Sequence, residues 1–180
     1  MIAYKGFHKD LSCMGKKFKE NQWSEEKEAN CVRNGFHCAS DPLDCLHYYP
    51  NWDESVYYIV LAEGDIDEDG SDTKIACTRI KPIHKLTRRE FVCEAMMYMQ
   101  KNPNMKWNNL VQEECGEHKN NNNMVIVRGE DPKAKGHLGD VIGLAIEEEG
   151  RVTEIAVFEI DGDCFLPDTF YNISGEEVVA

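Results

Sequence analysis

Residues 87–101 carry the pattern that most constrains the fold. Thr87 and Glu90 have the spacing of a capping box, in which each side chain satisfies an open backbone N–H group at the start of a helix. The apolar residues that follow recur at the spacing of one helix face: Phe91, Val92, Ala95, Met96 and Met99. Asn102-Pro103 ends the pattern. The segment therefore predicts one amphipathic helix with these five side chains on its inner face.

Three further segments of the first half predict strands. Residues 2–7 form a short apolar run that ends near a glycine. Residues 55–62 are β-branched or aromatic on both faces, which is typical of a central strand. Residues 74–80 follow after an acidic turn, so the last two segments are expected to pair as a hairpin.

Two shorter helices are also expected. Asp41 is a good N-cap residue and Pro42 suits the first helical position, which predicts a helix that ends before Pro50. Trp107 and Leu110-Val111 suggest another short helix after 87–101.

Beyond the asparagine run at 120–123 the sequence reads as β. The expected strands are 141–146 and 155–160, joined by a turn at 149–151, followed by 170–173 and 177–179. The fold class expected from all of these segments is α+β, with a mostly antiparallel sheet, two or three helices and an all-β C-terminal part. The expected division is an N-terminal domain at 1–118, an Asn-rich loop or linker at 119–136, and a C-terminal β segment at 137–180, either separate or packed on the same core.

The composition is that of a globular protein without a membrane span. Hydrophobic residues make up 42% of the 180-residue chain, and no run approaches the ~18 apolar residues that cross a bilayer. The N-terminus lacks the apolar core of a signal peptide. The expected location is the cytoplasm.

The net charge of −13 is unevenly spread and bears on partners. Between Arg33 and Lys74 there are ten Asp or Glu residues and no Lys or Arg. An acidic surface repels phosphate backbones, so direct binding to nucleic acid is disfavoured. The same charge favours a basic partner, including a protein groove that holds nucleic acid, although it also serves solubility alone.

The eight cysteines favour buried thiols over a metal site or a disulfide framework. The closest pairs, Cys31 to Cys38 and Cys38 to Cys45, are seven residues apart, whereas zinc sites favour pairs two to four apart. His37 and His47 leave open a metal site by convergence, but the expected metal set is none. Cys38 with His37 or His47 is also the best candidate for a catalytic thiol, which needs a lowered pKa, a nearby base and access to solvent.

A series of short motifs resembles an uncharacterised domain family common in bacteriophage and prophage genomes. The residues that carry the resemblance are Tyr4-Lys5-Gly6-Phe7, Cys13, Asn34-Gly35-Phe36-His37-Cys38, Pro42-Leu43-Asp44, Tyr48-Tyr49-Pro50, Glu63-Gly64-Asp65, Lys74-Ile75-Ala76 and Leu86-Thr87. The stretch from Lys135-Gly136-His137-Leu138-Gly139 to Asp161-Gly162 and Pro167–Tyr171 is similar to a segment that often accompanies this domain. The resemblance implies a phage context, with the cytoplasm of a bacterial host as the location, and no particular activity.

Two enzyme-like or ion-binding patterns are weaker alternatives. Asp65, Asp67 and Asp69 imitate the start of a calcium loop, but position 12 is Ala76 where an EF-hand has glutamate. The residues Tyr4, His37, Tyr48 and Glu63 occur in the order in which ADP-ribosyltransferases hold NAD, which is an analogy at the level of fold. The chain lacks the G-x-G-x-x-G, P-loop, H-E-x-x-H and G-x-S-x-G motifs.

The hypothesis that combines these observations is a phage accessory protein without catalytic activity or cofactor. It would bind a host protein, such as a CRISPR-type defence protein with a basic nucleic-acid groove, and so inhibit it. The acids expected to make the contact are Asp65, Asp67, Asp69 and Asp72. The aromatic side chains of Trp52, Tyr57 and Tyr58 are expected to be exposed and to anchor the partner.

Overall fold

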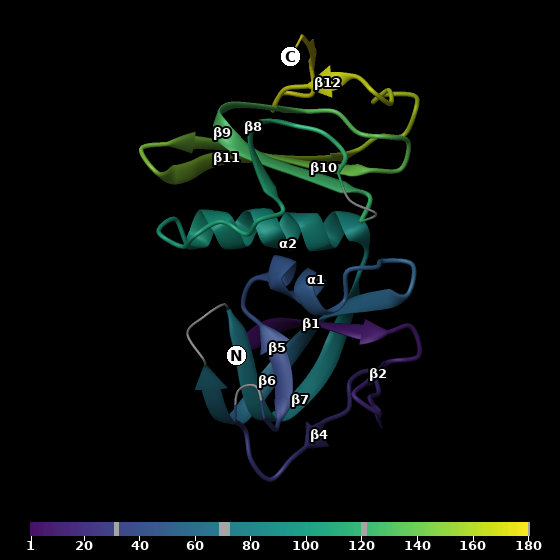
Figure 1. Ribbon diagram of the computed structural model, residues 1–180, viewed down its shortest axis with the longest axis vertical. Helices are drawn as coiled ribbons and strands as arrows, with labels where there is room; N and C mark the ends of the chain where they lie inside the picture. The colour runs from purple at the N-terminus through teal and green to yellow at the C-terminus, as the bar shows by residue number, and fades with distance from the viewer. Residues whose placement is uncertain (31–32, 69–72, 120–121, 180) are drawn as a thin grey trace. The chain divides into compact units, whose positions relative to one another are not determined.

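The computed structural model describes residues 1–30, 33–68, 73–119 and 122–179. The chain forms two compact units, Met1–Thr87 and Arg88–Ala180 (Figure 1). The first unit ends immediately before the helix that the sequence predicted. The boundary expected after residue 118 lies within the second unit, and a strand at Met124–Ala134 lies within the range expected to be a loop or linker.

The first unit is a small ring of antiparallel strands. Its elements are β1 (Ile2–His8), β2 (Ser12–Cys13), β3 (Lys16–Lys17), β4 (Ser24–Glu25), β5 (Phe36–Ala39), the 3-10 helix η1 (Pro42–Asp44), α1 (Cys45–Tyr48), β6 (Ser55–Glu68) and β7 (Lys74–Leu86). Strand β1 pairs with β5 and β6, and β7 also pairs with β5 and β6. Among the described residues these four strands therefore close on themselves, and β4 pairs with β7 next to β5. The expected hairpin of β6 and β7 is confirmed.

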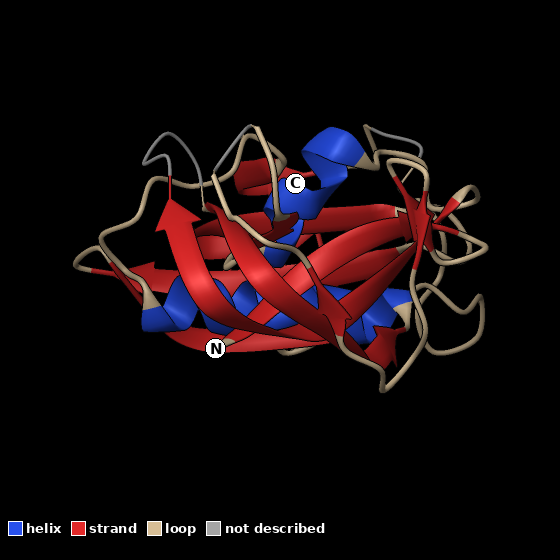
Figure 2. Cartoon of the chain, turned by 90° about the horizontal axis from the view of Figure 1, so that it is seen from below, coloured by secondary structure: helices blue, strands red, loops and turns tan. Residues whose placement is uncertain are grey.

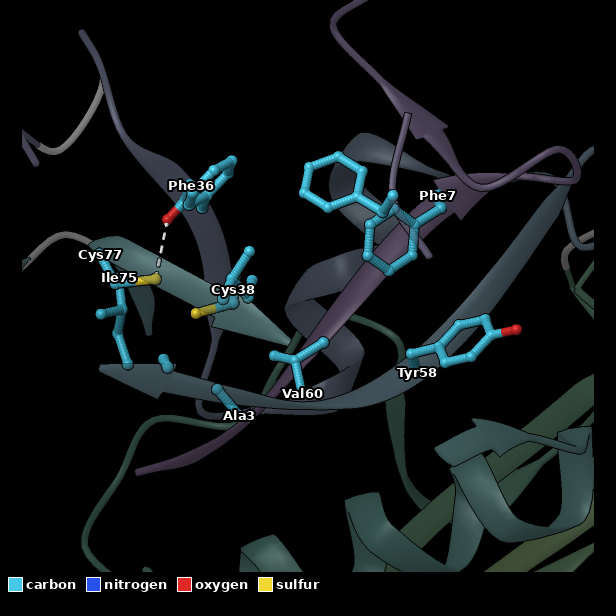
Figure 3. Close-up of a cluster of buried hydrophobic side chains, with 11 residues drawn as sticks. Ala3, Phe7, Phe36, Cys38, Tyr58, Val60, Ile75 and Cys77 are labelled. Carbon is cyan, nitrogen blue, oxygen red and sulfur yellow. Dashed lines mark hydrogen bonds between the residues drawn. The ribbon is translucent and has the colours of Figure 1, made fainter. Parts of the chain in front are cut away.

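The interior of this ring is filled by aromatic, aliphatic and thiol side chains (Figure 3). Phe7 is fully buried and contacts the rings of Phe18 and Tyr58, with centroids 5.1 and 5.7 Å apart. The sulfur atoms of Cys38 and Cys77 point toward each other from neighbouring strands. Lys5 is buried as well, and its ammonium donates to the backbone carbonyl of His37 at 2.6 Å.

The helix expected after residue 41 is confirmed, in two short pieces. Asp41 accepts a hydrogen bond from the Leu43 N–H at 2.9 Å, which is the N-cap contact that the sequence predicted. The helical segment η1–α1 ends at Tyr48, before Pro50. Leu43 and Leu46 are buried on its inner face.

The second unit is a mixed sheet with one helix on it. Its elements are α2 (Arg88–Lys101), β8 (Val111–Gly116), β9 (Met124–Ala134), β10 (Val141–Glu148), β11 (Arg151–Glu159), β12 (Phe170–Tyr171) and β13 (Glu177–Val178). Strand β9 lies between β8 and β10 and is parallel to both, whereas β10 and β11 form an antiparallel hairpin. The parallel strands are apolar over consecutive residues, such as 125–127 and 141–145, because both faces of the sheet are covered there.

Helix α2 confirms the strongest prediction from the sequence. It spans Arg88–Lys101, and its buried residues are Phe91, Val92, Ala95, Met96 and Met99. Figure 1 shows the helix along one face of the sheet, where it contacts β9, β10 and β11. Gly143 on β10 allows the close approach, because a Cβ atom there would lie 2.8 Å from Val92 and 3.0 Å from Met96.

The second unit buries the charged side chain of Arg128 almost completely. Arg128 on β9 is 1% exposed. Its Nε donates to Glu147 at 2.8 Å, and its guanidinium lies 4.6 Å from the ring centroid of Trp107. The pairing and the stacking together offset the loss of hydration of the guanidinium group.

The expected fold class, α+β with two or three helices on a mostly antiparallel sheet, is wrong. Strands hold 49% of the structure and helices only 12%, so the chain is closer to all-β (Figure 2). The helix expected around 107–111 does not form. Asn108 accepts a hydrogen bond from the Leu110 N–H in a side-chain turn, and Val111 begins strand β8. The parallel pairs of β8, β9 and β10 are a second departure from the expectation.

The sequence predicted no membrane span, and the helices of the structure agree with this prediction. Within the described residues, α2 is the longest helix, and none has the length and apolar character needed to cross a bilayer.

Candidate functional site

The most distinctive surface feature of the first unit is the exposed end of strand β6. Residues Glu63–Glu68, which we call the acidic arm, are all exposed, whereas the preceding part of β6 is mostly buried. The reason is the pairing. Strand β1 pairs with β6 only as far as Leu61, and beyond Ala62 the described pairing of β6 is with β7 alone. The arm carries four carboxylates: Glu63, Asp65, Asp67 and Glu68.

A β-bulge sets the geometry of the acidic arm. The register of β6 on β7 shifts between Glu63 and Ile66. Gly64 takes a φ of +82°, and a Cβ atom there would lie 2.0 Å from the Thr78 hydroxyl, so only glycine fits. The same hydroxyl accepts the Asp65 N–H at 3.0 Å. The bulge therefore bends the strand where its acidic side chains begin.

One basic side chain sits at the base of the acidic arm. Arg79 on β7 donates to Glu63 and to Glu25, both at 3.1 Å, and its guanidinium lies 4.5 Å from the ring centroid of Trp23. Glu63 is therefore partly neutralised, and most of the negative charge of the arm belongs to the residues after it. Asp69 and Asp72, which the sequence placed in the same surface, lie outside the described residues.

The predicted aromatic anchors are mostly buried, which corrects that expectation. Tyr57 is 0% and Tyr58 is 2% exposed. Their hydroxyls donate within the unit, to the Tyr49 carbonyl and to Glu20. Trp52 is half-buried and packs on Tyr57, with centroids 4.3 Å apart. Because residues 55–62 are apolar on both faces, the sequence does not show which side chains are exposed. In the structure, both faces of this part of β6 are covered.

The four residues of the NAD-binding analogy lie on four different elements of the first unit. Tyr4 on β1 and His37 on β5 are half-buried. Tyr48 ends α1 and is 56% exposed, and its hydroxyl accepts from Lys74 at 3.0 Å. Glu63 is held by Arg79 as described above. Burial, together with the charges of Lys5 and Lys74, lowers the pKa of His37.

The candidate catalytic thiol lacks the properties of a nucleophile. Cys38 is 4% exposed, inside the ring of strands. Hydrogen bonding to Cys77, and then burial, raise the pKa of the Cys38 thiol well above its ordinary value, whereas a catalytic thiol needs a lowered pKa. His37 is the adjacent residue of the same strand, so its side chain points to the opposite face.

The thiols of the described residues remain free, and three of the seven are buried, namely Cys38, Cys45 and Cys77. The expectation of buried thiols is thus correct for that part of the set. Cys31 lies outside the described residues.

A group with ligand atoms for a metal lies instead in the second unit. The side chains of His118, His137 and Asp140 place one such atom each within 4.8 Å of the others. Sequence reasoning missed this group, because His118 is 19 residues before His137 and no short-range spacing connects them. Only the pair His137 and Asp140, three residues apart in a glycine-flanked loop, gave a local signal.

The match to a known family covers the first half of the chain. Residues 1–94 match a family model described as "Domain of unknown function (DUF7666)". This range contains the whole ring of strands, the acidic arm and the first half of α2. No curated protein and no solved structure matches the chain.

Proposed function

The chain belongs to the DUF7666 family, a domain of unknown function, and from this premise we propose that it is a non-catalytic binding protein whose acidic arm contacts a basic protein. The proposal includes the phage setting that the sequence resemblance implies: an accessory protein in the cytoplasm of a bacterial host. The partner is a host protein with a basic groove of the kind that holds nucleic acid, and binding in that groove would inhibit it.

The observation that carries the proposal is the exposure of six consecutive residues at one end of an otherwise buried strand. An extended strand places successive side chains on alternating sides, about 3.3 Å apart along its length, so the carboxylates of the arm are presented to solvent on both faces of the strand end. The 34–73 segment around the arm holds no Lys or Arg. A concentration of exposed carboxylates suits a groove lined with Lys and Arg side chains, where complementary charge speeds association.

The single-sided pairing of the arm supports the same proposal. Edge strands present backbone groups to solvent, and charged side chains on them discourage pairing with further copies of the same chain. In the acidic arm the charges have one sign, so self-association is disfavoured while approach of a basic surface is favoured. Solubility alone would be served by scattered charges and does not need this concentration on one strand end.

The NAD-using alternative is not part of the proposal. Glu63, the glutamate of the analogy, is ion-paired with Arg79, and the Tyr48 hydroxyl accepts a hydrogen bond from Lys74. The buried, thiol-lined interior of the first unit supplies no second route to catalysis.

The test compares two variants with equal charge change. The arm variant is Asp65→Asn/Asp67→Asn/Glu68→Gln. The control is Glu148→Gln/Glu149→Gln/Glu154→Gln, which neutralises three exposed acids of the second unit. Each tagged protein is used to capture partners from a bacterial lysate at low and high salt, with and without nuclease. We expect a stoichiometric basic partner that the wild type and the control retain at low salt, and that the arm variant and high salt release.

Two results would overturn the proposal. Equal capture by the arm variant and the control would mean that the arm makes no contact. Capture of nothing, together with hydrolysis of NAD by the wild type that is lost in Glu63→Gln, would establish the enzyme alternative.

A further inference from the structure

We propose that His118, His137 and Asp140 form a binding site for a divalent transition-metal ion such as Zn²⁺. The site lies in the second unit and does not depend on the acidic arm. It uses two imidazoles and one carboxylate, a ligand set that suits Zn²⁺ and its first-row neighbours.

The sheet brings these residues together from separate parts of the chain. Strands β8 and β9 are parallel, with Gly116 opposite Ala134 at their ends. The pairing continues one step further, where the Lys135 N–H donates to the Gly116 carbonyl at 3.0 Å. His118 comes two residues after Gly116 and His137 three residues after Ala134, so both side chains leave the same edge of the sheet.

A tight turn then places the Asp140 carboxylate beside the ring of His118. The Asp140 N–H donates to the His137 carbonyl at 3.0 Å, and Gly139 takes the positive φ of +85° that this turn needs. A Cβ atom on Gly136 would lie 3.0 Å from Asp140 Oδ2, so glycine leaves the room that the carboxylate occupies.

The ligand atoms are close enough for one ion. His118 Nδ1 lies 2.8 Å from Asp140 Oδ2, and the rings of His118 and His137 have centroids 4.5 Å apart. All three ligand atoms lie within 4.8 Å of one another. Zinc takes nitrogen and oxygen ligands at about 2.0–2.2 Å, which places two ligands of one ion about 3–4 Å apart. A small rotation of the exposed His137 ring covers the difference.

The strongest argument is a buried carboxylate oxygen without a protein partner. Asp140 is 0% exposed. Its Oδ2 accepts the His137 N–H at 2.7 Å, but its Oδ1 has no hydrogen-bond partner among the described residues. A buried unpaired oxygen of a carboxylate is costly, and a cation beside it removes that cost.

The surroundings give the ion access from solvent. The side chain of His118 is 20% and that of His137 is 62% exposed, so the group opens to solvent on one side. Asp168 Oδ1 lies 3.8 Å from His137 Nε2, so a second carboxylate stands near this ring without a hydrogen bond to it. Three protein ligands and an open side leave room for water on the ion.

The experiment uses the full-length chain, reduced and stripped of metal with a chelator. Titration calorimetry with Zn²⁺ measures affinity and stoichiometry, and titration with Co²⁺ followed by absorption spectroscopy reports whether thiolates bind the ion. We expect one ion per chain and a Co²⁺ spectrum without thiolate-to-metal charge transfer. His137→Gln changes an exposed side chain and should weaken Zn²⁺ binding by about 100-fold or more, because even outer-shell changes weaken metal binding by about 10–100-fold.

Asp140→Asn and a control complete the design. Asp140→Asn keeps the shape of the side chain and should also weaken binding, whereas His84→Gln, an exposed histidine of the first unit, should leave it unchanged. Circular dichroism of each variant confirms folding. The proposal fails if the wild type binds no Zn²⁺, if His137→Gln binds as tightly as the wild type, or if the Co²⁺ spectrum shows thiolate ligands.

Discussion

The first unit closes its strands into a ring around one core, whereas the second lays a single long helix on a mixed sheet. In the ring, β1, β5, β6 and β7 each pair with two neighbouring strands, and their closure surrounds one core. In the second unit, the five buried side chains of α2 supply much of the cover for β10 and β11. One unit therefore depends on strand pairing and the other on the docking of a helix.

The same difference explains where each unit exposes its candidate site. Among the described residues, β6 pairs beyond Ala62 with β7 alone, and the acidic arm begins there. The second unit gathers His118 and the 137–140 turn at an edge of the sheet where two parallel strands end. Parallel strands bring loops that are distant in sequence to one edge, which antiparallel hairpins do not.

Breaking α2 should have the largest effect. Met96→Pro removes a backbone hydrogen bond in the helix interior, which costs about 3 kcal/mol or more, and also deletes a fully buried side chain. We expect peptides of β9, β10 and β11 to lose protection in hydrogen exchange measured by mass spectrometry, while peptides of β1 and β6 keep theirs. Met96→Leu, a swap of similar volume, should cost less than about 1.5 kcal/mol. Equal loss of protection in both units would show that the ring also depends on α2.

Two glycine substitutions compare how tightly Tyr49 packs on the ring with how tightly α2 packs on its sheet. A Cβ atom on Gly6 in the ring would lie 2.6–3.0 Å from Cδ2, Cγ and Cβ of Tyr49, which are the rigid base of an aromatic side chain. A Cβ atom on Gly143 would meet the flexible Met96 side chain and a methyl group of Val92. Overpacking costs about 1–3 kcal/mol, so we expect Gly6→Ala near the upper end and Gly143→Ala near the lower end.

Urea unfolding of both alanine variants measures this difference. The comparison stands if Gly6→Ala has the lower free energy of unfolding. A greater loss in Gly143→Ala would mean that α2 sits more rigidly on its sheet than Tyr49 sits on the ring.

Local patterns predicted what depends on local contacts. The inner face of α2 follows from the spacing of Phe91 to Met99, and the cap at Asp41 follows from the preference of Asp before proline. Both involve residues within a few positions of each other, so the sequence carries the full signal. Trp107 and Val111 misled because three apolar residues fit a short helix and a strand start equally well, and the Asn108 turn decides between them.

The features that the sequence did not predict depend on pairing between residues that are distant in the sequence. Closure of the first unit requires β5, four residues long, to pair with β1 and β7 at once, and no pattern within Phe36–Ala39 announces two partners. The candidate metal site depends on the register of β8 on β9, which alone brings His118 to Asp140. The sequence shows where the acidic residues lie along the chain. The pairing of β1 with β6, which ends at Leu61, decides which of them lie together on the surface.

The two units also bury charge differently, and in the first unit this appears as a dependence of stability on pH. Arg128 in the second unit is buried beside the opposite charge of Glu147. In the first unit, burial raises the pKa of Asp41 from 3.8 to about 7, and the neighbouring like charge of Asp44 acts in the same direction. The folded state then binds a proton at Asp41 that the unfolded state releases between these two values. The contribution of Asp41 to stability is therefore lost as pH rises from about 4 to about 7.

Asp41→Asn isolates this contribution, because asparagine keeps the oxygen that accepts the Leu43 N–H but carries no charge. We expect the variant to gain stability relative to the wild type as pH rises from about 5 to about 8, measured by urea unfolding at each pH. The lowered pKa of His37 gives a dependence of opposite sign, which is common to both proteins and cancels in the difference. A difference that stays constant over this range would mean that Asp41 titrates alike in the folded and unfolded states. The first unit would then bury the Asp41 carboxyl without a dependence of its stability on pH.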